Sequence, residues 1–117
     1  SYNKINGVWS HYNYDLNTQI LRNEWGYEGN VITDWWMQYA DSKEFPEISG
    51  NAYRVRAGVD VLMPGSKEVH GPTGENDGTL LASLGKKDGI TLGEIQRSAG
   101  TILKYCMGTR AMERNKD

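Results

Sequence analysis

Apolar side chains recur at helical spacing in two stretches of the chain. The first stretch places four of them near one face of a helix: Leu16, Ile20, Leu21 and Trp25. Asn13 or Asp15 would cap the free amides at its start, and Gly26 suits the left-handed position that ends a helix. The second stretch runs for roughly four turns: Leu92, Ile95, Ala99, Ile102, Leu103 and Met107. Thr91 followed by Glu94 is a capping-box pattern, so the sequence predicts an amphipathic helix that begins there.

Two short runs between these helices read as β-strands. Residues 31–33 are β-branched throughout, and residues 59–63 are mostly apolar and end at Pro64-Gly65. Such runs are typical of strands that are buried on both faces of a parallel sheet. Residues 51–57 read as a helix ended by Gly58, and residues 80–84 read as a short helix. The alternation predicts an α/β fold with βα units and two or three short parallel strands.

The remaining segments read as loops. Residues 1–13 are polar and aromatic, with a turn signal at Asn6-Gly7, and residues 35–46 look irregular. Residues 65–78 form a polar, glycine-rich stretch that would lie on the same side as Asp34 if the strands are parallel. The charged residues 113–117 are expected to fray.

Composition narrows the class of protein. The chain has 117 residues, 14 glycines, 38% hydrophobic residues and a net charge of −2. That length suits one domain, and the low hydrophobic content indicates a small core or a piece of a larger body. The sequence has no basic stripe for nucleic acid and no apolar run long enough to span a membrane. The start at Ser1 shows no signal-peptide pattern and reads as a cut within a longer chain, with the cytoplasm as the working expectation for its compartment.

Asp34 is the first candidate for chemistry. It ends the strand at residues 31–33, and residues at the carboxyl ends of βα strands face the active site. An ionised carboxylate there suits a nucleophile, a base or a metal ligand, or it caps the next segment. The adjacent Trp35 and Trp36 favour a sugar site, because indole faces stack on the apolar face of a pyranose ring. A pair of tryptophans can also belong to a core.

Other polar residues favour structural roles. Asp60 lies in the second strand, where an internal ion pair with Arg54 or Arg56, or backbone hydrogen bonds, is expected. His11 and His70 have no second ligand at metal-binding spacing, so no metal site and no cofactor are expected. Cys106 cannot form an internal disulfide and is expected to be a buried structural thiol. The glycines of the long loop form no phosphate-binding motif: Gly71, Gly74 and Gly78.

Four motifs taken in order resemble the closing part of the barrel domain of family 3 glycoside hydrolases, which are β-glucosidases and related exo-acting β-glycosidases. The motifs are Ser1-Tyr2-Asn3 with Asn6-Gly7, Leu21-Arg22-Asn23-Glu24-Trp25-Gly26-Tyr27 with Gly29, Val31-x-Thr33-Asp34-Trp35, and Ala57-Gly58-Val59-Asp60-Val61-Leu62-Met63-Pro64. The resemblance is strong over residues 1–65. It implies that residues 1–117 are a C-terminal fragment of one incomplete (β/α)8 TIM-barrel domain.

The resemblance also implies roles for individual residues. Asp34 maps onto the catalytic nucleophile, which would form a covalent glycosyl-enzyme and give retention. Trp35 would line the sugar subsite, Tyr2 would lie near the nucleophile, and Met63 would approach the same pocket. Thr33 replaces the commoner serine and keeps the hydroxyl group. Trp9 and Trp36 depart from the usual pattern and would reshape the pocket.

The family's acid/base residue and its other sugar-binding residues match nothing in this chain. The fragment is therefore expected to be inactive alone and to need the rest of a longer polypeptide. The substrate would be a β-linked oligosaccharide or an aryl or alkyl glycoside, and the role lies in carbohydrate metabolism. The end at Asp117 suggests either a fragment boundary or a domain order with the barrel last.

Two functions follow from these observations. The first is hydrolysis of terminal β-glycosidic bonds with retention. The alternative is a non-catalytic carbohydrate-binding or interaction module derived from a barrel. Because a partial barrel leaves strand edges and helix faces uncovered, the fragment is also expected to self-associate.

Overall fold

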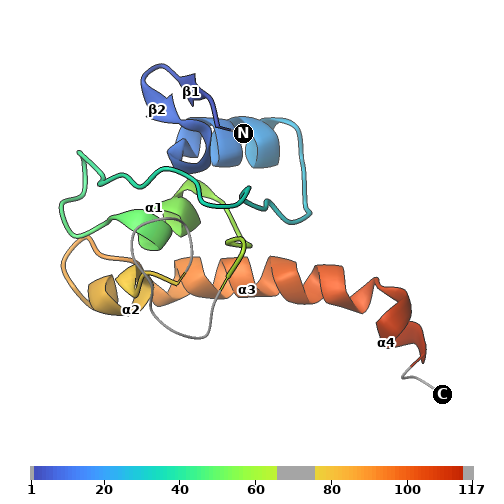
Figure 1. Cartoon of the computed structure of the whole chain (residues 1–117). Helices are drawn as coiled ribbons and strands as arrows, with labels where there is room; N and C mark the ends of the chain where they lie inside the picture. The colour runs from blue at the N-terminus through green and yellow to red at the C-terminus, as the bar shows by residue number, and fades with distance from the viewer. Residues whose placement is uncertain (1, 66–75, 115–117) are drawn as a thin grey trace.

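The computed structural model describes residues 2–65 and 76–114 (Figure 1). Its elements in chain order are β1 (Lys4–Ile5), β2 (Val8–Trp9), the 3₁₀ helix η1 (Ser10–Tyr12), the π-helix η2 (Asp15–Glu24), α1 (Gly50–Ala57), α2 (Thr79–Ser83), α3 (Leu92–Met107) and α4 (Arg110–Arg114). Most of the loop expected at residues 65–78 lies outside the described residues, with His70 in it.

The N-terminal segment is a β-hairpin rather than a plain loop. Lys4 pairs with Trp9 and Ile5 with Val8, in antiparallel register. The turn predicted at Asn6-Gly7 is confirmed, with φ angles of 52° and 79°. Two left-handed residues make the turn whose twist suits a two-residue hairpin. The strands were not predicted because two residues are too short to show alternation.

The first predicted helix is present as η2. The side chain of Asn13 accepts a hydrogen bond from the Leu16 amide at 3.0 Å, which confirms it as a cap. Gly26 follows the helix with φ of 72°, as predicted. Trp25, at the C-terminal end of η2, is 73% exposed. The described residues therefore leave the apolar face of η2 largely uncovered at this end.

The two predicted strand segments lie parallel, joined by one bridge between Ile32 and Val61. The Thr33 amide donates to the Val61 carbonyl at 2.9 Å, and the Asp60 amide donates to the Val31 carbonyl at 2.8 Å. The parallel pairing is therefore confirmed, although it is too short for a named strand. Its importance for the site is that it places residues 31–34 beside residues 60–63.

Helix α1 begins and ends as predicted. Gly58 has φ of 111°, and its amide donates to the carbonyls of Arg54 and Val55. A β-carbon at Gly58 would lie 2.7 Å from the hydroxyl oxygen of Thr18 in η2, so glycine also permits this close approach. Beneath α1 lies a small core formed by four buried residues: Ile48, Ala52, Val55 and Ile90.

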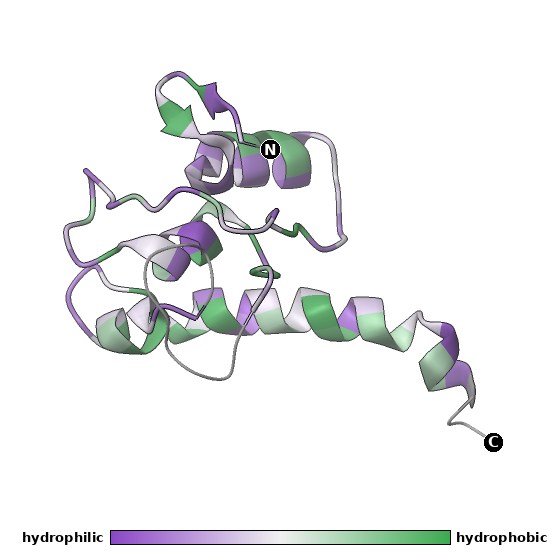
Figure 2. Cartoon of the chain, in the orientation of Figure 1, coloured by the Kyte–Doolittle hydropathy of each residue, from purple (hydrophilic) through white to green (hydrophobic). Residues whose placement is uncertain are grey.

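Helix α3 is the longest element, and the capping box of Thr91 and Glu94 is present as predicted. Apolar positions recur along it (Figure 2). Its C-terminal half runs beyond the rest of the body and leads into α4, a helix that was expected to be partly frayed chain (Figure 1). Several large apolar side chains of α3 are exposed: Leu92, Leu103, Tyr105 and Met107.

The described residues thus form a small helix-rich body whose assigned sheet is the hairpin of β1 and β2. The helix-rich character agrees with the prediction, but the expectation of two or three parallel strands was wrong for the described residues, where the assigned strands are antiparallel and the parallel pairing is a single bridge. The barrel itself remains a prediction. Within residues 2–65 and 76–114, each helix is too short or too polar to span a membrane.

Candidate functional site

Asp34 follows the bridged segment and lies exposed at its end. Its Oδ1 atom accepts a hydrogen bond from the backbone amide of Trp35 at 2.7 Å. The segment before it is held on one side by the Thr33 amide, which donates to the Val61 carbonyl, and the Thr33 side chain is buried. Ile32 is 58% exposed, so the expectation that this segment is buried on both faces was wrong. The carboxylate is therefore presented to solvent from an anchored backbone.

Tyr2 reaches Asp34 from 32 positions earlier in the chain. Its hydroxyl donates to the Trp35 carbonyl at 2.7 Å. Desolvation raises the pKa of Tyr2, and the charge and hydrogen bonding of Asp34 raise it further. The phenol thus stays protonated beside the carboxylate at neutral pH. The structure brings together three of the predicted site residues: Tyr2, Asp34 and Trp35.

The two tryptophans beside Asp34 form an aromatic corner. The rings of Trp35 and Trp36 meet edge to face, with their centroids 5.2 Å apart. They are 45% and 58% exposed, so neither belongs to the core. Trp36 has a φ of 49°, a conformation that a bulky residue rarely adopts and that suggests a functional constraint. Such exposed indole faces can stack on a sugar ring.

Met63 lies next to this group through Thr33. The Met63 amide donates to the hydroxyl oxygen of Thr33 at 2.8 Å, which ties the ends of the two parallel segments together. This contact explains why a hydroxyl residue is useful before Asp34. Met63 itself is half-buried.

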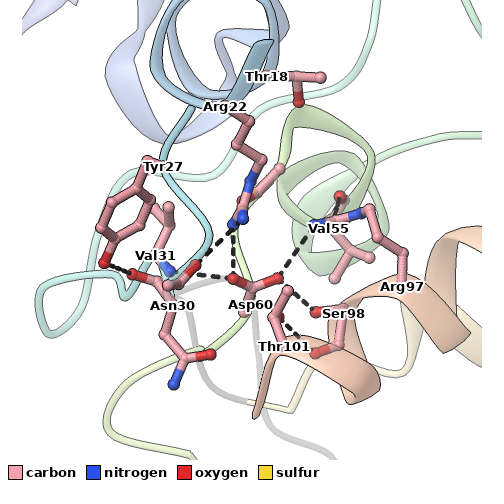
Figure 3. Close-up of polar contacts among 12 residues, drawn as sticks. Thr18, Arg22, Tyr27, Asn30, Val31, Val55, Asp60, Arg97, Ser98 and Thr101 are labelled. Atoms are coloured by element: carbon pink, nitrogen blue, oxygen red, sulfur yellow. Dashed lines mark hydrogen bonds and ion pairs between the residues drawn. The ribbon is translucent and has the colours of Figure 1, made fainter. Parts of the chain in front are cut away.

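Asp60 is the centre of a buried polar network (Figure 3). Its Oδ2 atom accepts hydrogen bonds from Arg22 at 2.7 Å and from the Val31 amide at 3.0 Å. Its Oδ1 atom accepts hydrogen bonds from Arg97 at 3.2 Å and from the Ser98 hydroxyl at 3.0 Å. The network joins η2, the bridged segments and α3.

The internal ion pair predicted for Asp60 is confirmed, but its predicted partners were wrong. Arg54 is fully buried on another face of α1 and donates to Asn51 and to the Gln38 carbonyl. Arg56 turns towards the start of α3, where it pairs with Glu94. Neither α1 arginine is therefore directed at Asp60, and arginines from η2 and α3 take that place.

Asp34 does not line either of two cavities among the described residues. A cleft of about 1110 Å3 lies between the hairpin, α1 and the start of α3, and its lining includes Tyr12, Tyr53 and Arg56. A small hollow of about 140 Å3 reaches Thr33 from the side of His11. The group around Asp34 is an open surface here.

Two other predictions can be judged. Cys106 is exposed on α3, so the expectation of a buried thiol was wrong. Periodicity places it near the apolar face of α3, but the described residues leave that part of the helix uncovered. His11 is buried and its Nε2 lies 3.0 Å from the Gln38 carbonyl oxygen. No cluster of metal-ligating side chains occurs among the described residues.

Sequence reasoning missed two contributors to this region, Arg22 and Arg97. Both were visible as cations on predicted helices on either side of the strand that carries Asp60. A buried carboxylate requires such partners. Arg22 also belongs to the motif of residues 21–27 that carries the family resemblance. Its place in that motif was the signal that could have pointed to it.

Comparison with known proteins adds independent evidence. No model of a protein family matches the chain. A β-glucosidase of Ruminococcus albus is 41% identical over 97% of this chain and 11% of that protein. A β-glucosidase of Rhizobium radiobacter is 30% identical over 100% of this chain and 12% of that protein. The solved structure of a β-glucosidase from Paenibacillus barengoltzii has a TM-score of 0.66 and 38% identity, over 95% of this chain and 12% of that one. The chain spans about a tenth of the length of these relatives.

Proposed function

Because this chain is homologous to a segment of β-glucosidases, we propose that it carries the nucleophile of a family 3 retaining β-glycosidase. The observation that supports this most directly is the grouping of Asp34, Tyr2 and Trp35 at the end of an anchored strand. In this proposal, the chain acts as one part of a longer polypeptide.

The chemistry assigned to Asp34 is nucleophilic substitution at the anomeric carbon. The carboxylate forms a C–O bond to that carbon while the glycosidic bond breaks, and the leaving oxygen takes a proton from an acid group. Water then attacks the glycosyl-Asp ester, gives up a proton to the same group, and restores the β configuration.

The surrounding residues have separate tasks. The phenol of Tyr2 lies close to Asp34 and donates to the carbonyl of the adjacent Trp35, so it can hold the backbone that carries the carboxylate. Trp35 offers an exposed indole face for the sugar ring, with Met63 alongside. The acid/base group and the remaining sugar contacts come from other parts of the polypeptide. The substrate class is a terminal β-glucoside, either a β-linked oligosaccharide or an aryl or alkyl glycoside.

Replacement of Asp34 tests the assignment in the full-length protein that carries this segment. We expect Asp34→Gly to lower turnover of an aryl β-glucoside by about three orders of magnitude or more, because the covalent step is lost. Added azide should restore turnover of an activated aryl glucoside and give a glycosyl azide of the α configuration, because the small anion fills the vacated space.

A matched control is Asp41→Ala, which removes another exposed carboxylate. This variant should keep its activity within about twofold, as expected for a surface change away from the site. Activity of Asp34→Gly close to that of the unaltered protein would refute the assignment. A β-configured azide product would show that the covalent intermediate still forms on another residue, and would refute Asp34 as the nucleophile.

A further inference from the structure

We propose that Asp60 and Arg22 are positioning residues that set the place of Asp34, a role that rests on the proposed function of Asp34 as nucleophile. Their side chains are almost wholly buried, with 11% of Arg22 and none of Asp60 exposed. Their link to Asp34 runs through the backbone of residues 29–33.

Asp60 holds Val31 at both of its backbone groups, the amide and the carbonyl. The amide of Asp60 donates to the Val31 carbonyl at 2.8 Å. The carboxylate of Asp60 accepts from the Val31 amide at 3.0 Å. This double contact fixes the two peptide planes on either side of Val31, three positions before Asp34.

Arg22 fixes the backbone on the N-terminal side of Val31, at Gly29. Its guanidinium donates to the Gly29 carbonyl at 3.1 Å, to the Gly58 carbonyl at 2.9 Å and to the Asp60 carboxylate at 2.7 Å. A guanidinium presents donors in a rigid planar fork, so these three contacts define one arrangement of the two segments. Figure 3 shows the side chain of Arg22 extending from η2 towards Asp60.

The far end of the segment is fixed separately. The Thr33 amide donates to the Val61 carbonyl, and the Thr33 hydroxyl accepts from the Met63 amide. Between these anchors the backbone has little freedom, whereas the Asp34 side chain is exposed and accepts a bond from its neighbour Trp35. The location of the carboxylate therefore depends on the anchors before it.

The two oxygens of Asp60 serve different parts of the molecule, and this provides a matched control. Oδ2 accepts from Arg22 and Val31, which lead to Asp34. Oδ1 accepts from Arg97 and Ser98, which lie on α3. Loss of a contact on the Oδ2 side should alter the rate of the covalent step, and loss of the Ser98 contact should not.

The experiment uses the full-length protein and an activated 2-deoxy-2-fluoro-β-glucoside, a probe whose glycosyl-enzyme accumulates. Mass spectrometry gives the fraction of molecules that become labelled and the first-order rate constant of labelling at saturating probe. A purely structural defect lowers the labelled fraction and leaves the rate constant of the remaining molecules unchanged. A positioning defect lowers the rate constant itself.

We expect Arg22→Lys and Asp60→Asn to lower the labelling rate constant by about 10- to 100-fold, because small displacements of a reacting group have effects of this size. Ser98→Ala should stay within about twofold of the unaltered protein. Arg22→Lys keeps the positive charge, so it remains informative if Asp60→Asn folds poorly. A wild-type rate constant in Arg22→Lys would overturn the positioning role.

Different outcomes of this experiment would overturn the proposed function and the positioning role. Absence of an adduct on Asp34 in the unaltered protein would overturn the proposed function and the positioning role together. An adduct on Asp34 that forms equally fast in the unaltered protein and in Arg22→Lys would overturn the positioning role alone.

Discussion

Tyr12 shows at the scale of one residue how a buried polar group is accommodated. Its hydroxyl donates to the Gln38 carbonyl at 3.0 Å and accepts from the Ala40 amide at 3.1 Å. The guanidinium of Arg54 lies 4.8 Å from the centre of its ring. Burial raises the pKa of Tyr12 to about 12, although Arg54 and the Ala40 amide act in the opposite direction.

Replacement of Tyr12 by phenylalanine should lower the free energy of unfolding by about 1–2 kcal/mol, because the half-buried Ala40 amide loses its acceptor. Tyr14→Phe is the control, since Tyr14 is 46% exposed and should change stability by less than about 0.5 kcal/mol. Urea unfolding at pH 7 measures both. Equal stabilities of the two variants would contradict the role given to the Tyr12 hydroxyl.

The raised pKa of Tyr12 also fixes the sign of a pH effect. A folded-state pKa above the unfolded value means that the stabilising contribution is complete below about pH 10 and declines as the pH approaches 12. The Phe variant lacks this group, so the stability difference between the two proteins should shrink over that range.

The sequence predicted the position of a single residue only where that position depends on its immediate neighbours in the chain. Asp34 at the end of a strand followed from the β-branched run before it, and the turn at Asn6-Gly7 followed from residue type. The approach of Tyr2 to Asp34 came only from the family resemblance. The partners of Asp60 could not be chosen, because three predicted helices all offered arginines.

At the scale of an element, α3 combines a local cap with a long-range ion pair. The Thr91 hydroxyl accepts from the Glu94 amide at 3.1 Å, and Glu94 returns a contact to the Thr91 amide at 3.0 Å. Glu94 also pairs in a bidentate fashion with Arg56 of α1, with both distances at 2.8 Å. Burial raises the pKa of Glu94, but its hydrogen bonds with Arg56 and Thr91 outweigh burial, so the pKa lies below its usual value.

Glu94→Gln separates these two contributions, because glutamine can keep the capping box but loses the charge. We expect the free energy of unfolding to fall by about 1–2 kcal/mol at pH 7. The lowered pKa means that this contribution is present above about pH 4.5 and is lost as the pH falls through the folded-state value. The difference from the unaltered chain should therefore narrow in acid.

The control for this element is Glu47→Gln, whose partner Lys86 lies 3.4 Å away in an exposed pair. Such a pair contributes at most about 0.5 kcal/mol after screening. Denaturant unfolding between pH 3 and pH 7 measures both variants. A stability difference for Glu94→Gln that does not depend on pH would count against the ion pair as its cause.

Elements were predicted well where their signals are local. The capping box of α3 and the left-handed Gly58 after α1 each depend on a few adjacent residues. The β-branched run at residues 31–33 forms only one parallel bridge, because strand pairing depends on residues far away in the chain. The hairpin strands were missed because each has two residues. The exposure of Cys106 was missed because periodicity defines a helix face without showing what covers it.

The whole molecule has an uneven distribution of apolar surface. The core beneath α1 is small, whereas Leu103, Tyr105 and Met107 on the projecting half of α3 are each more than 60% exposed. Leu103 and Met107 are four residues apart and lie on the same side of the helix. An apolar surface of this kind marks a contact site.

The isolated chain should therefore self-associate in a concentration-dependent way. The double variant Leu103→Glu/Met107→Glu should shift the equilibrium towards monomer, because it places charges on the exposed face. Sedimentation velocity over a range of concentrations measures this shift. Leu81→Glu is the control, since Leu81 is 81% exposed on α2 and away from this face. A monomeric unaltered chain at all concentrations would exclude self-association.

The shared carboxylate of Asp60 has a consequence for recombination between relatives. Its contacts come from residue 22, from residue 31 and from residues 97 and 98, so they join segments spread over most of the chain. A chimera with a crossover between Arg22 and Asp60, or between Asp60 and Arg97, can inherit the anion without its cations. Where the two parents differ at any of the three residues, productive exchange of this region requires that the three be inherited as one block.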